Sequence, residues 1–297
     1  MGNHFFSSFN QNGNLTSLPV STEYCPITTG ELIYEPNVDT LAVRMRWLDP
    51  AKEVQYLEYA EKNGITEIYL AEPSPNRHTA DFIGRASEKG IKVFWLRGDM
   101  TLDNTVIRNG YINNYLPFQA SQPEHKRFAG VHLDVEPWSQ PNPTSSETRQ
   151  KMIDFLVSLR DEFPDEHFDR DLDVGMGGTV TYRGQPDVPL YQAFIQEADR
   201  VIMMSYTDTA KKIINMSLVP AYIAYARSLN KQIFLAVDSN NNLGSSFKDR
   251  GKSAMYYELN QLKGLANYNK LGLAIHHMSE WYNLPDYGVD CEPGSSA

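Results

Sequence analysis

The chain has 297 residues, of which 41% are hydrophobic and 22% charged, and its formal net charge is −10. These fractions are typical of a folded globular protein and exclude an intrinsically disordered chain. The longest apolar runs, such as 233–237, fall far short of the roughly 18 residues of a membrane-spanning helix. The acidic balance and the lack of a basic stripe argue against nucleic acid or an anionic membrane as a partner.

The two ends of the chain differ in composition from the segment between them. Residues 1–39 are rich in Asn, Ser, Thr, Gly and Pro and predict an irregular arm, and residues 286–297 predict a short tail. Cys25 and Cys291 lie in these segments, so a disulfide framework is excluded; the two thiols either pair, if the ends meet, or stay free. No basic stretch precedes an apolar one at the N-terminus, so we expect a secreted protein if a signal was removed and a cytoplasmic one otherwise.

Between residues 40 and 285, short β-branched or apolar runs alternate with amphipathic stretches. The expected strands are Leu41–Trp47, Glu67–Ala71, Ile91–Leu96, Gly130–Val135, Leu172–Met176, Val201–Ser205, Gln232–Val237 and Leu271–His276. The expected helices are Ala51–Asn63, Thr79–Lys89, Ser145–Arg160, Leu190–Glu197, Ile213–Leu229 and Ser253–Leu265, with Leu102–Leu116 as either a helix or an insertion. Strict alternation of strand and helix implies a parallel sheet.

A closed barrel fits this alternation better than an open sheet. An open doubly wound sheet needs a glycine-rich turn after its first strand, and here that place holds Trp47-Leu-Asp49-Pro50 without a glycine. Asp49 and Pro50 instead suit the first turn of a helix. The sequence therefore predicts a single (β/α)₈ TIM barrel, residues 40–285, with an irregular N-terminal arm.

In such a barrel, chemistry takes place at the carboxyl ends of the strands. Polar residues gather at these positions: Asp49, Glu72, Arg97, Asp99, Asp134, Glu136, Thr179, Tyr206, Asp208, Asp238, Asn240, His276, His277 and Glu280. On the first strand, Arg44 and Arg46 alternate with apolar residues, so inward-facing arginines are expected to pair with these acids.

The fourth strand carries the most informative pattern. Because side chains alternate along a strand, His132, Asp134 and Glu136 share one face, and burying three ionisable groups is costly unless they serve a purpose. Two close carboxylates repel, so one is expected to hold a proton, which is the state of a general acid. The alternative is a buried hydrogen-bond network that only fixes the strand.

The run Ala129-Gly-Val-His132-Leu-Asp134-Val-Glu136 resembles the fourth-strand signature of family 18 glycoside hydrolases, D-G-x-D-x-D-x-E. It matches at Gly130, Asp134 and Glu136 and departs at Ala129 and His132. The run Met204-Ser-Tyr206-Thr is similar to the family's sixth-strand motif Met-x-Tyr-Asp, with Thr207 in place of the acid and Asp208 one residue later.

The resemblance implies a retaining hydrolase assisted by the substrate's own 2-acetamido group. Glu136 would protonate the glycosidic oxygen, Asp134 would orient the acetamido group, and Tyr206 would hold it by a hydrogen bond. His132 would take the place of the family's middle Asp. The family's floor tryptophan has no exact counterpart, since His276 stands near its place and Trp281 follows five residues later.

Three alternatives remain open. Asp238, after the seventh strand, could be the nucleophile of a glycosidase that uses Glu136 as its acid/base. A metal-dependent barrel enzyme could draw ligands from the strand ends, namely Glu72, Asp134, Glu136, Asp238, His276 and His277, although no compact metal motif is present. A barrel that binds a glycan without cleaving it is the third.

The sequence thus predicts a glycosidase with a carbohydrate substrate, no cofactor and no metal, and it sets no oligomeric state. The expected catalytic residues are Glu136, Asp134 and Tyr206. The expected substrate-binding residues are Trp47, Glu72, His132, Trp138, Met204, Asp208, Asp238, His276, Glu280 and Trp281.

Overall fold

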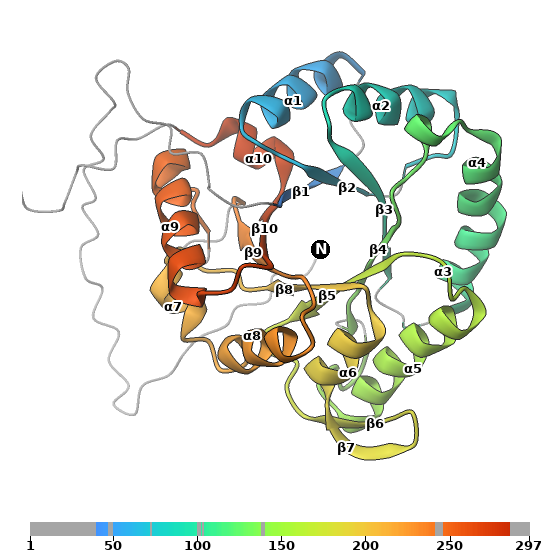
Figure 1. The fold of residues 1–297 in the computed structure, drawn as a ribbon, viewed down its shortest axis with the longest axis vertical. Helices are drawn as coiled ribbons and strands as arrows, with labels where there is room; N and C mark the ends of the chain where they lie inside the picture. The colour runs from blue at the N-terminus through green and yellow to red at the C-terminus, as the bar shows by residue number, and fades with distance from the viewer. Residues whose placement is uncertain are drawn as a thin grey trace, which may run out of the picture.

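The computed structural model describes residues 40–46, 50–71, 73–99, 102, 104–137, 140–240 and 246–285. Within these ranges, eight parallel strands close into a barrel in the order β1-β10-β9-β8-β5-β4-β3-β2. Helices surround the barrel on the outside (Figure 1). The predicted (β/α)₈ architecture is therefore confirmed. The predicted arm, the tail and both cysteines lie outside the described residues.

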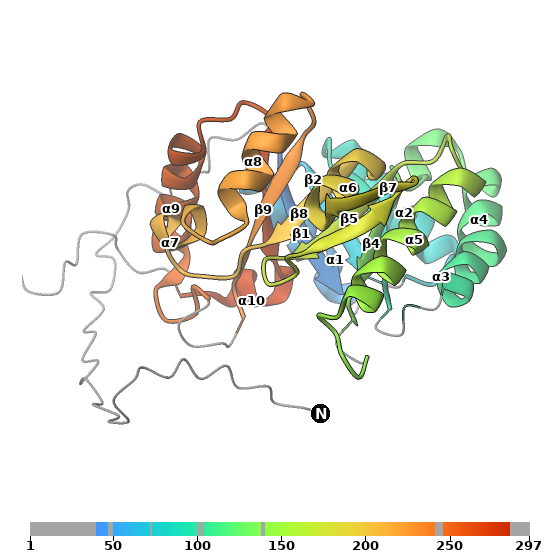
Figure 2. The ribbon, with the colours of Figure 1, turned by 90° about the horizontal axis from the view of Figure 1, so that it is seen from below.

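The barrel strands are β1 Leu41–Arg46, β2 Glu67–Ala71, β3 Lys92–Asp99, β4 Val131–Val135, β5 Phe168–Asp173, β8 Arg200–Met204, β9 Ile233–Asp238 and β10 Leu271–His276. The helices are α1 Pro50–Lys62, α2 Arg77–Glu88, α3 Asn104–Gly110, α4 Leu116–Ser121, α5 Ser146–Glu162, α6 Leu190–Glu197, α7 Ala210–Ile214, α8 Val219–Ser228, α9 Gly251–Ala266 and α10 Met278–Asn283. In the side view, α8 and α9 flank one side of the barrel and α3, α4 and α5 the other (Figure 2). None of the described helices is long and apolar enough to cross a membrane.

Side chains of the barrel strands divide into two cores because successive residues point to opposite faces. The larger core lies between the strands and the helices and includes Val131, Leu133 and Val135 of β4. The smaller core fills the barrel interior and includes Tyr69, Phe94, Ile202 and Phe234 among other residues.

The interior holds a buried charge network at the amino ends of its strands. Arg200, the first residue of β8, lies 2.7 Å from Glu67 Oε1 through Nη1 and 2.9 Å from Asp169 Oδ1 through Nε. His167 Nε2 lies 2.7 Å from the same Asp169 oxygen. The guanidinium also packs between the rings of Phe94 and Phe234. One cation thus pairs with two carboxylates from different strands, and buried charges require such partners.

A glycine on β10 makes room for one of these rings. A Cβ atom at Gly272 would lie 2.4 Å from the Phe234 ring, closer than atoms in proteins approach. The missing side chain therefore lets Phe234 occupy the interior next to Arg200.

Two local predictions differ from the structure, and a third, which was left open, is decided by it. Strand β5 covers 168–173 rather than 172–176, so it ends in Asp173 and not before Gly177. The expected helix 213–229 is two helices, α7 and α8, because Pro220 begins a new helix in its first turn. The uncertain segment 102–116 contains α3, which continues through the π-helical turn Tyr111–Tyr115 into α4.

A hairpin that the sequence did not predict follows β5. It consists of β6 Thr179–Tyr182 and β7 Gln185–Pro189 and lies beside α5 and α6 (Figure 1). The Gln150 side chain on α5 pairs with the backbone of Thr181: its Nε2 donates to the Thr181 oxygen at 2.8 Å, and its Oε1 accepts from the Thr181 nitrogen at 2.8 Å. This amide takes the place of a neighbouring strand.

Candidate active site

The central contact of the site joins opposite charges across the barrel mouth. Arg44 on β1 donates through Nη2 to Asp134 Oδ2 on β4. Strands β2 and β3 lie between these two strands, and near their carboxyl ends they carry the small residues Ala71 and Gly98. Small side chains there leave space for a long arginine to reach across. The expectation that an inward arginine pairs with a strand-end acid is confirmed for Arg44.

Only one oxygen of the Asp134 carboxylate is engaged. Oδ2 receives Arg44, whereas Oδ1 is buried and has no hydrogen-bond partner among the described residues. An unpartnered buried acceptor is rare in proteins and calls for an explanation. Gly98 lies beside this carboxylate, since a Cβ atom at Gly98 would be 3.9 Å from Oδ2.

His132 forms a second inward pair on the same strand. Its Nε2 lies 3.0 Å from Asp171 Oδ2 on β5, and its ring stacks on Tyr69 with centroids 4.0 Å apart. The side chain is only 2% exposed. The imidazole is enclosed by its neighbours and holds Asp171, and a role of His132 in substrate binding stays a prediction.

The two neighbouring carboxylates, Asp134 and Asp171, differ in their tendency to bind a proton. Burial raises the pKa of Asp134 above its ordinary value, and the Asp171 charge raises it further, against the opposing effects of Arg44 and His132. Burial also disfavours the ionised form of Asp171, but His132 and Arg44 outweigh this effect and lower its pKa. Asp134 is therefore the first of the two to take up a proton.

Glu136 follows directly after β4 and is half-buried. Continued by one residue, the alternation that turns Asp134 inward predicts Glu136 on the same face, one step nearer the solvent. On the opposite face, Arg170 holds this end of the strand: it donates to the carbonyl oxygens of Leu133, at 3.1 Å, and Val135. Burial lowers the pKa of Arg170 to about 10 against the raising effect of acids that include Glu136, so the guanidinium stays charged at neutral pH.

A second group of polar residues lies at the ends of β8, β9 and β10. Asp238 Oδ1 accepts a hydrogen bond from the Asn240 nitrogen at 2.9 Å and lies 3.3 Å from His276 Nδ1. The His276 ring stacks on Tyr206, with centroids 5.6 Å apart. Burial and the Asp171 charge raise the pKa of Tyr206 well above its ordinary value, with smaller contributions from Asp134 and Asp238. The Tyr206 phenol therefore keeps its proton, and it lies close enough to feel the charges of both Asp134 and Asp238.

Three other predicted residues, Met204, Asp208 and Glu280, lie at or after the ends of β8 and β10. Met204 is the last residue of β8 and is 6% exposed. Lys212 Nζ donates a hydrogen bond to Asp208 Oδ1 at 2.6 Å. Glu280 accepts from Ser279 Oγ at 2.6 Å and pairs with His277 Nδ1. None of these contacts joins Asp208 or Glu280 to Asp134.

Trp281 is not a sugar-binding residue, and that prediction is wrong. It lies on α10 with no exposed surface, its Nε1 donates to Tyr256 Oη at 3.0 Å, and its ring packs on Tyr59. The indole belongs to the packing between helices, because α10 begins right after His277 and turns this side chain away from the mouth. Trp47, Glu72 and Trp138 lie outside the described residues.

Asp171 is the main residue of the site that the sequence did not reveal. The run Phe168-Asp-Arg-Asp-Leu-Asp173 alternates acidic with apolar or cationic residues, so it lacks the apolar character expected of a buried strand. The alternation itself was the available signal, since it places Asp169, Asp171 and Asp173 on one face.

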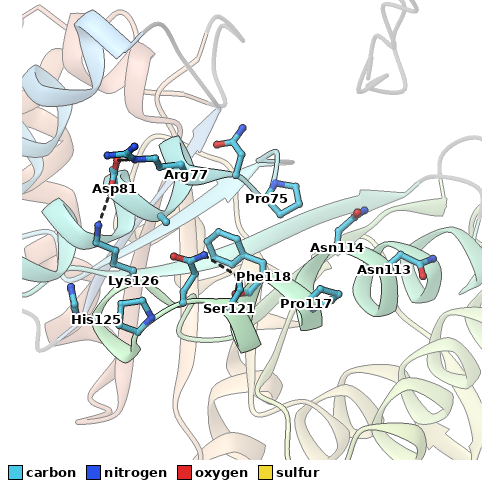
Figure 3. A pocket seen from close by; sticks show the side chains of 14 residues that line it. Pro75, Arg77, Asp81, Asn113, Asn114, Pro117, Phe118, Ser121, His125 and Lys126 are labelled. Atoms are coloured by element: carbon cyan, nitrogen blue, oxygen red, sulfur yellow. Dashed lines mark hydrogen bonds and ion pairs between the residues drawn. The ribbon is translucent and has the colours of Figure 1, made fainter.

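Two further observations bound the site. Among the described residues, no group of three or more His, Cys, Asp or Glu side chains is arranged to hold a metal ion. A cleft of about 750 Å³ lies on the outer surface between α2 and α4, where Asp81 and Lys126 form an ion pair (Figure 3). None of its lining residues lies on a barrel strand.

No protein-family model matches the sequence, and no curated protein matches it. Several solved structures are similar in fold. The Bacillus cereus spore cortex-lytic enzyme SleL shares 12% identity over 82% of this chain and 73% of its own, with a TM-score of 0.49. A putative α-L-fucosidase from Bacteroides thetaiotaomicron shares 11% identity over 84% and 91%, with a TM-score of 0.49. A family 18 chitinase variant from Cycas revoluta shares 11% identity over 81% and 95%, with a TM-score of 0.47. At such identities the similarity describes the fold alone.

Proposed function

We propose that this protein hydrolyses glycosidic bonds of a glycan that contains 2-acetamido sugars, with retention of configuration. The observation that carries the proposal is the half-engaged carboxylate of Asp134, whose Oδ2 is fixed by Arg44 while Oδ1 is buried without a partner. An acetamido N–H is a donor that suits Oδ1. The Tyr206 hydroxyl, which stays protonated, suits the acetamido carbonyl oxygen.

Glu136 supplies the proton in this proposal. It gives its proton to the glycosidic oxygen while the acetamido oxygen attacks C1, so the bond between C1 and the leaving oxygen breaks and its electron pair stays on that oxygen. Water then attacks C1 from the vacated side and gives a proton back to Glu136, and the acetamido group is restored. Asp134 stabilises the charge that develops on the acetamido nitrogen.

The test compares variants on a chito-oligosaccharide substrate. We expect Glu136→Gln to lose about 10²- to 10⁴-fold in kcat with an unchanged Tm, because a general acid contributes about that much. Glu162→Gln is the matched control, since Glu162 is exposed and, within the described part of the chain, pairs only with Arg108 on the outer surface. Turnover by Glu136→Gln equal to that of the wild type would remove Glu136 from the mechanism.

A thiazoline analogue of N-acetylglucosamine tests the acetamido step. It mimics the cyclic intermediate, and such mimics bind about 10²-fold or more tightly than substrate. We expect Asp134→Ala to weaken its binding and Asp238→Ala to have a smaller effect. If Asp238→Ala abolishes activity and the thiazoline does not bind, Asp238 acts as the nucleophile. If a glycan binds and no variant affects turnover, the barrel only binds glycans.

A further inference from the structure

Asp238 and His276 form a fixed pair at the mouth of the barrel. They occupy the ends of neighbouring strands and are register partners of β9 and β10. Asp238 is 3% exposed, and the same oxygen that faces His276 Nδ1 at 3.3 Å also accepts the Asn240 N–H. A buried carboxylate beside one ring nitrogen favours the proton on that nitrogen. The geometry therefore favours the tautomer in which Nε2 carries a lone pair.

The second nitrogen of His276 is open to the mouth. Nε2 has no hydrogen-bond partner among the described residues, and it is not among their buried unpartnered atoms. The side chain is 23% exposed, and the stacking of its ring on Tyr206 restricts its rotation. A neutral imidazole held in this way presents one hydrogen-bond acceptor in a defined direction.

The position of this acceptor relates it to the carboxylates of β4. In the closed barrel, β10 lies four strands from β4 in either direction, so His276 stands opposite the strand of Asp134. Figure 1 shows the two strands on opposite sides of the barrel. Arg44 is the register partner of His276 and also reaches Asp134, so a donor stands beside the acceptor.

We propose that His276, oriented by Asp238, is a hydroxyl-binding residue: Nε2 accepts a hydrogen bond from a ring hydroxyl of the sugar bound between β10 and β4. Arg44 stands beside it as a donor to the same sugar. This inference rests on the proposed function and deepens it, because it assigns the polar contact that faces Glu136 across the sugar. Asp238 is a positioning residue in this proposal, since it acts through the tautomer of His276.

Two readouts test the proposal, with chitotetraose as the probe. The first is ¹⁵N NMR of the wild-type protein: we expect the His276 Nδ1–H tautomer, and a shift of the Nε2 resonance when chitotetraose is added. Asp238→Asn should change the tautomer, because an amide can donate to Nδ1 where the carboxylate only accepts. A wild-type Nε2 that carries the proton, or one whose resonance chitotetraose leaves unchanged, would overturn the proposal.

The second readout is kinetic. His276→Phe keeps a ring on Tyr206 and removes both nitrogens, and we expect KM for chitotetraose to rise about 3- to 10-fold, the effect of one lost neutral hydrogen bond. His276→Gln, which keeps an acceptor, should recover part of that loss. Equal kcat/KM in His276→Phe and the wild type contradicts this inference alone, provided that Glu136→Gln is inactive. If Glu136→Gln is fully active, the proposed function fails, and the Nε2 shift still decides whether His276 binds the sugar.

Discussion

Arg44 and Asp134 form an ion pair although two strands separate them in the barrel sheet. The arginine comes from β1, and the carboxylate comes from β4, which the proposed general acid, Glu136, directly follows. The ionisation of Asp134 therefore depends on Arg44, a residue outside the fourth-strand motif.

Replacing Arg44 by Met is expected to move the acidic limb of the pH–rate profile to higher pH. Arg44 lowers the pKa of Asp134 against the raising effects of burial and Asp171, so its loss raises that pKa further. Less of Asp134 is then ionised at any given acidic pH. The profile of kcat/KM measures the shift, and Arg44→Lys, which keeps the charge, is the control. An acidic limb that stays in place would show that Asp134 does not need to ionise.

Replacing Asp171 by Asn is expected to move the same limb in the opposite direction. The Asp171 charge raises the pKa of Asp134, and an amide of similar size removes that charge while it can still hydrogen-bond to His132. Asp134 then ionises at lower pH. The measurement is the same pH profile, with thermal unfolding as the check on the fold. If the Arg44 and Asp171 variants both moved the limb the same way, electrostatic coupling to Asp134 would be refuted.

Replacing Arg200 by Met should destabilise the protein by about 3–5 kcal/mol at neutral pH, because it leaves Glu67 and Asp169 buried without their cation. Urea unfolding measures the loss. Arg108→Met is the control, since its pair with Glu162 is exposed and screened by solvent, so that its loss should have little effect on stability. Equal effects of the two changes would contradict the network's role.

The stability lost in Arg200→Met is expected to depend on pH. Burial disfavours ionised Asp169, but Arg200 and His167 overcome this effect and lower its pKa to about 2. A lowered pKa contributes stability that is present above the unfolded value near 3.9 and is lost as pH falls towards 2. The deficit of Arg200→Met should therefore be largest near pH 7 and shrink below pH 4. A deficit that grows on acidification would exclude this account.

Two glycine substitutions should have opposite effects on stability. In Gly272→Ala the new Cβ lies 2.4 Å from the Phe234 ring in a packed interior, so we expect destabilisation of at least about 1–3 kcal/mol. In Gly264→Ala, on the exposed face of α9, the new Cβ meets nothing within 4 Å, and alanine should stabilise the helix by about 0.5–1 kcal/mol. Chemical unfolding of both variants measures the contrast, and destabilisation by Gly264→Ala would refute the packing argument.

The fold was predictable because most strands keep an apolar face towards the helices, as Val131, Leu133 and Val135 do on β4. The inward direction of Asp134 followed from alternation alone. Alternation could not supply the partners, since Arg44 and Asp171 are brought to β4 only when the barrel closes. Trp281 was misplaced for a related reason: five residues after the last strand, a helical turn had already rotated the indole into the packing against Tyr59.

The hairpin beside α5 and α6 has a consequence for how copies of this protein meet one another. A closed barrel has no free strand edge, but a two-stranded hairpin has two, and such edges invite intermolecular strand addition. The Gln150 amide occupies the hydrogen-bonding groups of Thr181 on one edge. On the other strand, Pro186 and Pro189 lack the N–H groups that an incoming strand would need. Both edges of the hairpin thus carry features that oppose the addition of a strand from another molecule.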